Sequence, residues 1–188
     1  MSARADALVE TELERQFLDQ LRAASGEVDG PMERHCVRLF LFAEMLAAER
    51  GVEIDRELVL CAAFMHDAGL YDSISHGGVY TDEGGEHAAR LFERAGASPE
   101  RVRMIADACA QHHALRDQSR RGTEVELTRL ADRIEVSGGT LSAGLGRERV
   151  RRVFSEVPRD GFYSGVAGLL AHALRHRPLS LPRIFKTD

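Results

Sequence analysis

Apolar residues recur at helical spacing along most of the chain, and this periodicity is the feature that most restricts the fold. Glycines and prolines interrupt it, and no stretch alternates between apolar and polar residues well enough to predict a strand. We therefore expect an all-α protein built as a single-domain helical bundle. The predicted helices span residues 2–24, 31–51, 55–67, 84–95, 98–113, 123–137, 146–156 and 161–177.

Residues with known preferences for helix ends mark several of these boundaries. Pro31 is favoured in a first helical turn, and Asp55 is a good N-cap. Thr123 and Glu126 have the spacing of a capping box, which predicts that Thr123 caps its helix. Residues 69–82 are rich in Gly, Ser and Asp, and we expect them to form a loop.

The length of 188 residues fits one domain with a sizeable core. We expect an N-terminal helix within residues 1–25 packed on the core, a helical domain over 26–177 and a C-terminal tail over 178–188. The chain has 25 Lys and Arg against 30 Asp and Glu, so its net charge is −5. This balance argues against a nucleic-acid partner, which would need clustered positive charge.

The cysteines and the absence of long apolar runs bear on the compartment. Cys36, Cys61 and Cys109 are odd in number and irregularly spaced, which predicts buried thiols in a reducing compartment. No 18-residue apolar run exists, and the N-terminus carries acidic residues where a signal peptide would be apolar. We expect a cytoplasmic protein without a membrane partner. A homodimer formed through the charged N-terminal helix is left open.

Two acidic residues stand where a charge is costly. Asp67 follows His66 at the end of an apolar helix, where both burial and the negative end of the helix dipole disfavour an ionised carboxylate. Asp132 lies among apolar residues of the helix predicted over 123–137, and a pairing with Arg129 or Arg133 is the alternative explanation. A bound cation would remove both penalties.

Histidines on other helices supply the remaining candidates for a metal site. His35 shares a core-facing stripe with apolar residues of its helix, and His112–His113 end the helix predicted over 98–113. Neutral imidazole and carboxylate are the usual ligands of zinc, iron, manganese and related ions. A helical bundle can bring such side chains from different helices to one central point.

The order His35 … His66-Asp67 … Asp132 resembles the H…HD…D signature of the HD-domain superfamily of metal-dependent hydrolases. The resemblance spans about residues 31–137. It implies one divalent transition metal (Zn, Fe, Mn, Co or Ni) held by His35, His66, Asp67 and Asp132. It also implies that water activated by this metal attacks phosphorus or carbon in a small-molecule substrate.

The superfamily pattern leaves the number of metals open, because many members hold two ions and take extra histidines from the middle helices. His112 fits the end of the corresponding family motif. His87 follows Gly84 and Gly85, whereas the two-metal pattern places its histidine before the glycine. This favours one metal over two. A di-iron oxygenase, which needs His112 and another ligand such as His87, is the alternative.

The substrate is indicated only in part. Leu70 stands where the signaling-nucleotide phosphodiesterase branch has a lysine, which counts against a phosphoester, although a phosphomonoesterase or nucleotidase on the same scaffold stays open. Residues 66–70, 85–92 and 122–137 resemble the cyanamide hydratase-like branch, which hydrates a nitrile-like carbon. The sequence therefore favours a hydrolase or a hydratase.

Four further residues are candidate catalytic groups. His112 and His113 are expected near the metal, with His112 also an open candidate as a ligand. Arg38 is a candidate anion contact, unless it pairs with an acidic residue such as Glu44. His76 lies in a Gly-rich loop that would cover the site, and it is a candidate proton donor. A non-catalytic interaction module remains as another alternative, although a complete set of buried charges argues against it.

Overall fold

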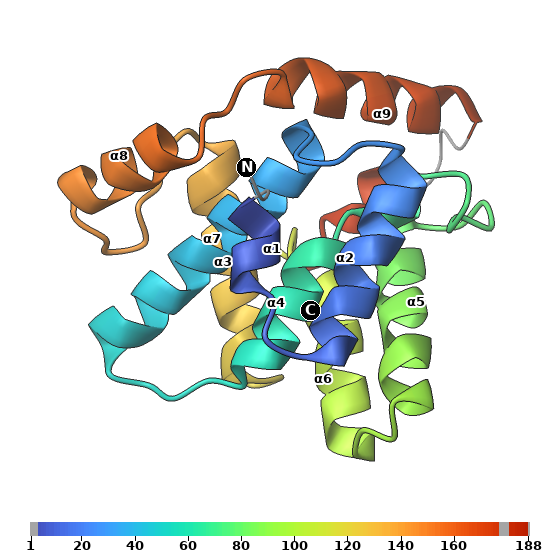
Figure 1. Cartoon of the computed structure of the whole chain (residues 1–188), viewed down its shortest axis with the longest axis horizontal. Coiled ribbons are helices and arrows are strands. Elements are labelled where there is room, and N and C mark those ends of the chain that lie inside the picture. The colour runs from blue at the N-terminus through green and yellow to red at the C-terminus, as the bar shows by residue number, and fades with distance from the viewer. Residues whose placement is uncertain (1–3, 177–180, 188) are drawn as a thin grey trace.

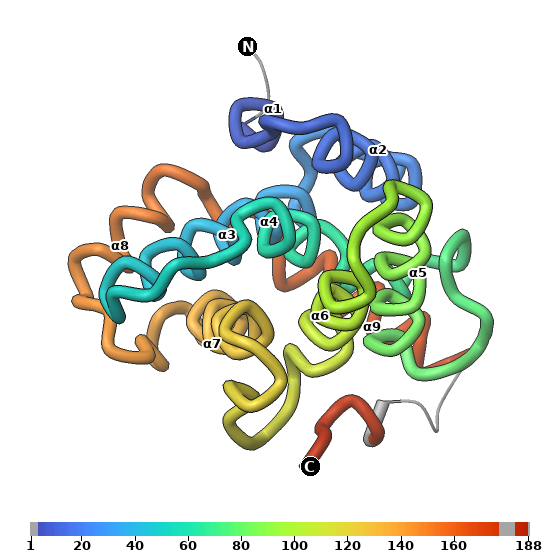
Figure 2. Tube along the Cα trace, turned by 90° about the horizontal axis from the view of Figure 1, so that it is seen from below, coloured from blue at the N-terminus to red at the C-terminus, as the bar shows by residue number. Residues whose placement is uncertain are grey.

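The computed structural model describes residues 4–176 and 181–187, and within these ranges helices are the only regular secondary structure, as the periodicity predicts. Figures 1 and 2 show the helices gathered around a central helix, α4. The elements are α1 (Arg4–Leu8), α2 (Glu12–Ser25), α3 (Pro31–Arg50), α4 (Arg56–Met65), η1 (Ala68–Leu70), α5 (Tyr80–Arg94), α6 (Pro99–Ala110), α7 (Thr123–Val136), α8 (Arg147–Glu156), α9 (Phe162–His176) and η2 (Leu181–Ile184).

Helix α4 forms the centre of the core. All of its residues from Leu58 to Met65 are buried, as expected for a helix that is apolar on every side. Asp55 caps it by accepting a hydrogen bond from the Leu58 amide at 3.1 Å, which confirms the predicted start. Helices α3, α6 and α7 surround it, and α5 packs against α6 as an antiparallel neighbour (Figure 1). His66 and Asp67 follow directly at the C-terminal end of α4.

The predicted helix over 2–24 is wrong, because the chain forms two helices there. Thr11 caps α2 by accepting from the Glu14 amide, and the Glu14 side chain accepts from the Thr11 amide in return. This capping box ends one helix and starts another, although the amphipathic pattern continues through it. Helix α1 is then tied to α2 because Arg22 donates to Asp6 at 2.8 Å.

Two other predicted helix starts also differ from the structure. Gly122, and not Thr123, is the N-cap of α7, and the Glu126 carboxylate binds Arg129 instead of closing a capping box. Helix α5 starts at Tyr80, inside the predicted loop. The Glu83 carboxylate in its first turn accepts from the main-chain amides of His76 and Gly78, which fixes the loop onto the helix.

The start of α5 lies directly against the turn that follows α4. A Cβ atom on Gly84 would lie 2.7 Å from the main-chain oxygen of Met65, and one on Gly69 would lie 2.1 Å from the main-chain oxygen of Tyr80. Only glycine allows backbones to approach so closely. The two glycines therefore determine how α5 holds the segment that carries His66 and Asp67.

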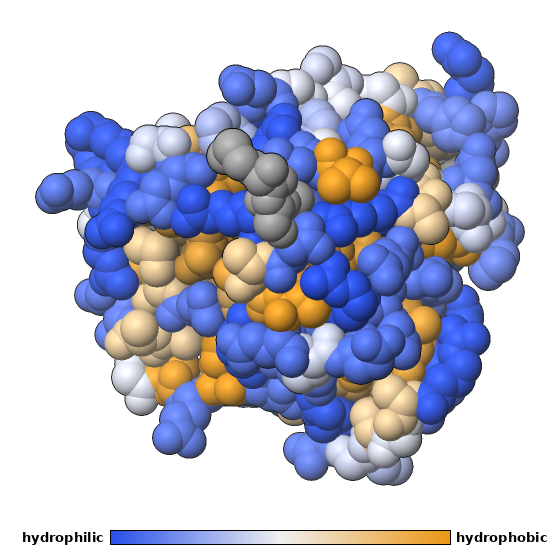
Figure 3. All heavy atoms as spheres, in the orientation of Figure 1, coloured by the Kyte–Doolittle hydropathy of each residue, from blue (hydrophilic) through white to orange (hydrophobic). Residues whose placement is uncertain are grey.

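The three cysteines are buried and free, as predicted. Among the described residues, no helix has the length and apolar character that a membrane crossing would require. The face shown in Figure 3 is mostly hydrophilic, with separate apolar groups between the charged side chains.

Candidate metal centre

Four separate parts of the fold deliver histidine and aspartate side chains to one point. His35 comes from the first half of α3, His66 and Asp67 from the turn after α4, and Asp132 from α7. His112 and His113 come from the turn that follows α6, since that helix ends at Ala110 and not at His113 as predicted. We call these six side chains the cluster. His35, His66, His112 and Asp132 are buried.

The distances within the cluster are short. His35 Nε2 lies 2.9 Å from His66 Nε2 and 3.8 Å from Asp132 Oδ1. Asp67 lies between the histidines, with Oδ2 at 3.3 Å from His66 Nε2 and 3.7 Å from His35 Nε2. His112 and His113 form the other side of the cluster. His112 Nε2 lies 3.4 Å from Asp67 Oδ1, and His113 Nδ1 lies 3.4 Å from Asp132 Oδ2.

The outer nitrogen of each of three histidines lies close to an acceptor oxygen, and this orients the rings. His66 Nδ1 lies 2.9 Å from the Ala63 carbonyl oxygen, and His112 Nδ1 lies 2.6 Å from the Cys109 carbonyl oxygen. His35 Nδ1 lies 2.9 Å from Glu135 Oε2. An acceptor on Nδ1 places the proton there and leaves the Nε2 lone pair facing inward. In their neutral form, all three rings therefore present a lone pair to the centre.

This arrangement fits a cation. Two inward lone pairs on His35 and His66 repel each other at 2.9 Å unless a proton or a metal ion lies between or beside them. Asp67 Oδ1 and His112 Nε2 are buried and make no hydrogen bond with the described residues. Buried polar atoms are costly without a partner, and a metal ion would satisfy them.

Three overlapping groups of side chains have the spacing of metal ligands. They are His35, His66 and Asp132; His66, Asp67 and His112; and His112, His113 and Asp132. All four residues that the HD resemblance names as ligands occur among them, and so do His112 and His113.

The electrostatics favour anionic carboxylates in the metal-free protein. Burial alone would raise the pKa of Asp67, but His66 and His112 hold it well below its ordinary value. Burial also opposes ionisation of Asp132, yet His113 lowers its pKa to about 2. Burial opposes the charged form of His66, but the carboxylates of Asp67 and Asp132 raise its pKa to about 9. In His112 burial prevails, and the pKa falls to about 4.

Comparison with protein families matches residues 32–137 to the HD domain, which is more than half of the chain. The chain belongs to the HD domain family. The match contains the whole cluster, so the HD resemblance and the geometry identify the same residues. HD domains bind divalent metals and form a superfamily of metal-dependent hydrolases. No curated protein matches the chain.

Arg38 does not reach the cluster as an anion contact in this HD domain. It is fully buried, and its guanidinium donates to Glu135 at 2.7 Å and to the Pro158 carbonyl at 2.8 Å. The pairing with an acidic residue is therefore the observed one, although the partner is Glu135 and not Glu44. Glu135 is a residue that the sequence reasoning missed. Its only signal was the position three residues after Asp132, on the same face of α7.

Two other histidines lie away from the cluster. His76 is exposed in the loop before α5, and only its main-chain amide is fixed, by Glu83. His76 belongs to none of the three ligand groups, and its role as a proton donor stays a prediction. His87 points to α2, where its Nε2 lies 3.2 Å from Gln20 Oε1. The second-metal alternative thus loses His87 as a ligand.

A pocket of about 390 Å³ opens onto the cluster, within the range of about 300–1,000 Å³ typical of small-molecule sites. Asp67, His113 and Asp132 contribute to its lining. The Tyr80 hydroxyl lies 2.7 Å from His113 Nε2, and this hydrogen bond fixes the ring at the inner end of the pocket. Phe162, at the start of α9, stacks on His35 with ring centroids 4.7 Å apart. The pocket therefore gives a small molecule access to the cluster on one side.

Proposed function

We propose that this HD domain is a metal-dependent hydrolase or hydratase of a small molecule, with one divalent transition metal (Zn, Fe, Mn, Co or Ni) held by His35, His66, Asp67 and Asp132. The observation that carries the proposal is the 2.9 Å separation of His35 Nε2 and His66 Nε2, in two rings whose outer nitrogens lie against Glu135 and the Ala63 carbonyl. The carboxylates of Asp67 and Asp132 lie beside these two nitrogens, so the neutral rings and both carboxylates offer four ligand groups to one ion.

A bound divalent ion lowers the pKa of its water toward about 7, which supplies a nucleophile at neutral pH. The chain's own residues would orient the substrate and handle protons. His113 is the best placed group for proton transfer, because it lines the pocket and contacts both Asp132 and Tyr80. Although burial opposes its charged form, Asp132 raises the pKa of His113. His112 is more deeply placed and would support Asp67.

One observation favours a second candidate. The three ligand groups overlap through His66, His112 and Asp132, which is also the arrangement that two neighbouring ions would need. A di-iron oxygenase would use His112 and His113 in place of His87. The hydratase alternative, by contrast, rests on the resemblance of three stretches to the cyanamide hydratase-like branch.

The test is elemental analysis of protein purified without chelators or metal-affinity steps. We expect about one transition-metal ion per wild-type chain and none in Asp67→Ala. Asp19→Ala, at an exposed position of α2, is the matched control and should keep its metal. Circular dichroism should show that both variants are folded.

Other results would change or contradict the proposal. Two irons per chain would favour the di-iron oxygenase, and an assay of oxygen consumption would then test it. A wild-type protein that holds no metal even after reloading would contradict the proposed function, and an interaction module would then be the better explanation. With one ion per chain, panels of amide, nitrile and phosphomonoester substrates follow.

A further inference from the structure

The pocket that opens onto the cluster has apolar walls. Its described lining outside the cluster is formed mainly by aliphatic and aromatic side chains from η1, α5, α7, α9 and residues 184–185. Leu70, Tyr80 and Phe162 are buried members of this wall, and Val166 and Leu170 on α9 are half-buried. The polar members of the lining are Asp67, His113 and Asp132 at the inner end, and Arg133 and Ser137 nearer the mouth.

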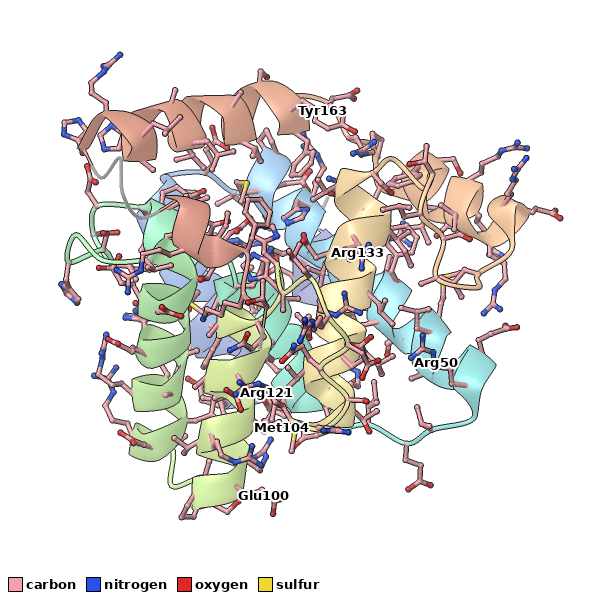
Figure 4. The ribbon with its side chains drawn as sticks, turned by 180° about the vertical axis from the view of Figure 1, so that it is seen from behind. Arg50, Glu100, Met104, Arg121, Arg133 and Tyr163 are labelled. Atoms are coloured by element: carbon pink, nitrogen blue, oxygen red, sulfur yellow. The ribbon has the colours of Figure 1, made fainter. Side chains whose placement is uncertain are left out.

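The apolar surface continues out to the mouth of the pocket. Val136, Leu141, Tyr163 and Phe185 line it and yet remain 44%, 51%, 57% and 54% exposed. These are four of the eight large apolar side chains that the described residues expose. An exposed apolar group of this kind around a concave site marks a binding surface for apolar ligands. Figure 4 shows Tyr163 at the start of α9 and Arg133 on α7 at the same end of the molecule.

Positive charge around the pocket is scarce. Arg133 is the one arginine in the described lining, which contains no lysine, and it forms no ion pair with the described residues. Arg38 and Arg159 lie close by but are engaged by Glu135 and by main-chain carbonyls. Lys186 pairs with Asp82. Recognition of a diphosphate or triphosphate normally uses several cationic or amide donors, so a single arginine at the mouth is a poor match for one.

We infer that the substrate is a largely apolar small molecule, an alkyl or aryl compound whose polar, reacting end meets the cluster and which carries at most one negative charge. The apolar body would lie along α9 between Phe162 and the mouth, and the charge, where present, would face Arg133. This inference rests on the proposed metal-dependent function, because it takes the cluster as the reacting end of the pocket.

Alkyl hydroxamates of increasing length test the inference on zinc-loaded protein. The hydroxamate group chelates the ion in every member of the series, so only the alkyl chain reports on the pocket. We expect calorimetric affinity to rise about threefold to fourfold per added methylene from acetohydroxamate to octanohydroxamate, until the pocket is filled. Equal affinity along the series would overturn the inference. Tighter calorimetric binding of ADP than of octanohydroxamate would also overturn it.

Variants locate the chain within the pocket. Leu141→Asp at the exposed mouth and Val166→Asp on the half-buried wall should each weaken octanohydroxamate at least tenfold and leave acetohydroxamate unchanged. Val52→Asp is the matched control, because Val52 is also exposed but does not line the pocket. The exposed position of Leu141 keeps the test valid if Val166→Asp fails to fold. Octanohydroxamate binding that is unchanged in Leu141→Asp, and in any folded Val166→Asp, would overturn the proposed placement.

A failure of the proposed function gives a different result. If the protein retains no metal, acetohydroxamate does not bind, and the metal proposal fails while the pocket can still be tested. Octanoate should then bind metal-free protein at least tenfold more tightly than acetate, and Leu141→Asp should remove the difference. Equal binding of the two carboxylates would overturn the substrate class.

Discussion

Glu135 holds the His35 ring from the side that faces away from the cluster, with 2.9 Å between Glu135 Oε2 and His35 Nδ1. The other carboxylate oxygen accepts from Arg38 Nε at 2.7 Å. All three side chains are fully buried. Although burial opposes ionisation, His35 and Arg38 lower the pKa of Glu135, so it remains an anion. This relationship links α3 to α7 and fixes the tautomer of a predicted metal ligand.

Replacing Glu135 with Gln should therefore weaken metal binding without removing it. A partner on the outer nitrogen of a ligating histidine typically contributes about 10–100-fold to metal affinity, and we expect a loss in this range. Competition with a metal-binding dye at pH 7 would measure it.

Glu126→Gln is the control for this substitution. Glu126 is also a buried acid on α7 that pairs with an arginine, Arg129, but it lies outside the cluster. The Glu126→Gln substitution should lower the free energy of unfolding and leave metal affinity unchanged. Equal metal affinities in Glu135→Gln and wild type would show that His35 does not depend on Glu135.

His112 and His87 should differ in their effect on metal binding, because only His112 belongs to the cluster. His112→Ala should lower metal affinity, because Asp67 Oδ1 would lose the buried neighbour that lies 3.4 Å away. His87→Ala should change neither the metal content nor the affinity, since His87 contacts Gln20 on α2. Elemental analysis and dye competition on both variants would check this. Loss of an ion on removal of His87 would contradict the observed placement.

Gly84 should tolerate no side chain. In Gly84→Ala the new Cβ would lie 2.7 Å from the Met65 oxygen, so α5 must shift away from the turn that carries His66 and Asp67. We expect a loss of about 1–3 kcal/mol in the free energy of unfolding, the usual cost of overpacking, together with weaker metal binding. Gly168→Ala on α9 is the control, because nothing lies within 4 Å of its Cβ position. It should be neutral or stabilise the protein by up to about 1 kcal/mol.

The contacts of Asp6 with Arg22 and Arg15 should make the stability of the protein depend on pH. Hydrogen bonds from Arg22 and Arg15 lower its pKa from 3.8 to about 2. A carboxylate with a lowered folded pKa contributes stability above its unfolded pKa and loses it as the pH falls toward the folded value. Asp6→Asn should therefore be less stable than wild type at pH 7, and the difference should shrink below about pH 4. Urea unfolding at several pH values would test this, with Asp19→Asn as the exposed control. A difference that does not change with pH would contradict the assignment.

The sequence predicted the parts of the fold that depend on local signals. Asp55 caps α4 and Pro31 begins α3, as their local preferences indicate. The split between α1 and α2 was also readable, because Thr11 and Glu14 have capping-box spacing. The continuous amphipathic pattern hid this signal. The early start of α5 was not local, since it depends on Glu83 capturing the amides of the preceding loop.

The candidate ligands were predictable for a different reason. The HD resemblance points to four side chains, and the structure brings them together with His112 and His113. Glu135 was missed because an acidic residue of a helix normally faces solvent. Its burial follows from Arg38 on a different helix. The placement of Phe162 over His35 is likewise a tertiary contact across most of the chain, which no local pattern encodes.

Because four chain segments meet at one point, a bound metal ion should also affect the stability of the fold. In the unfolded chain, His35, His66, His112 and Asp132 are far apart, so an ion would bind strongly only to the folded form. Such binding shifts the folding equilibrium by mass action, and the melting temperature should rise with the free-metal concentration. The amount of intact protein that survives proteases would then follow metal supply.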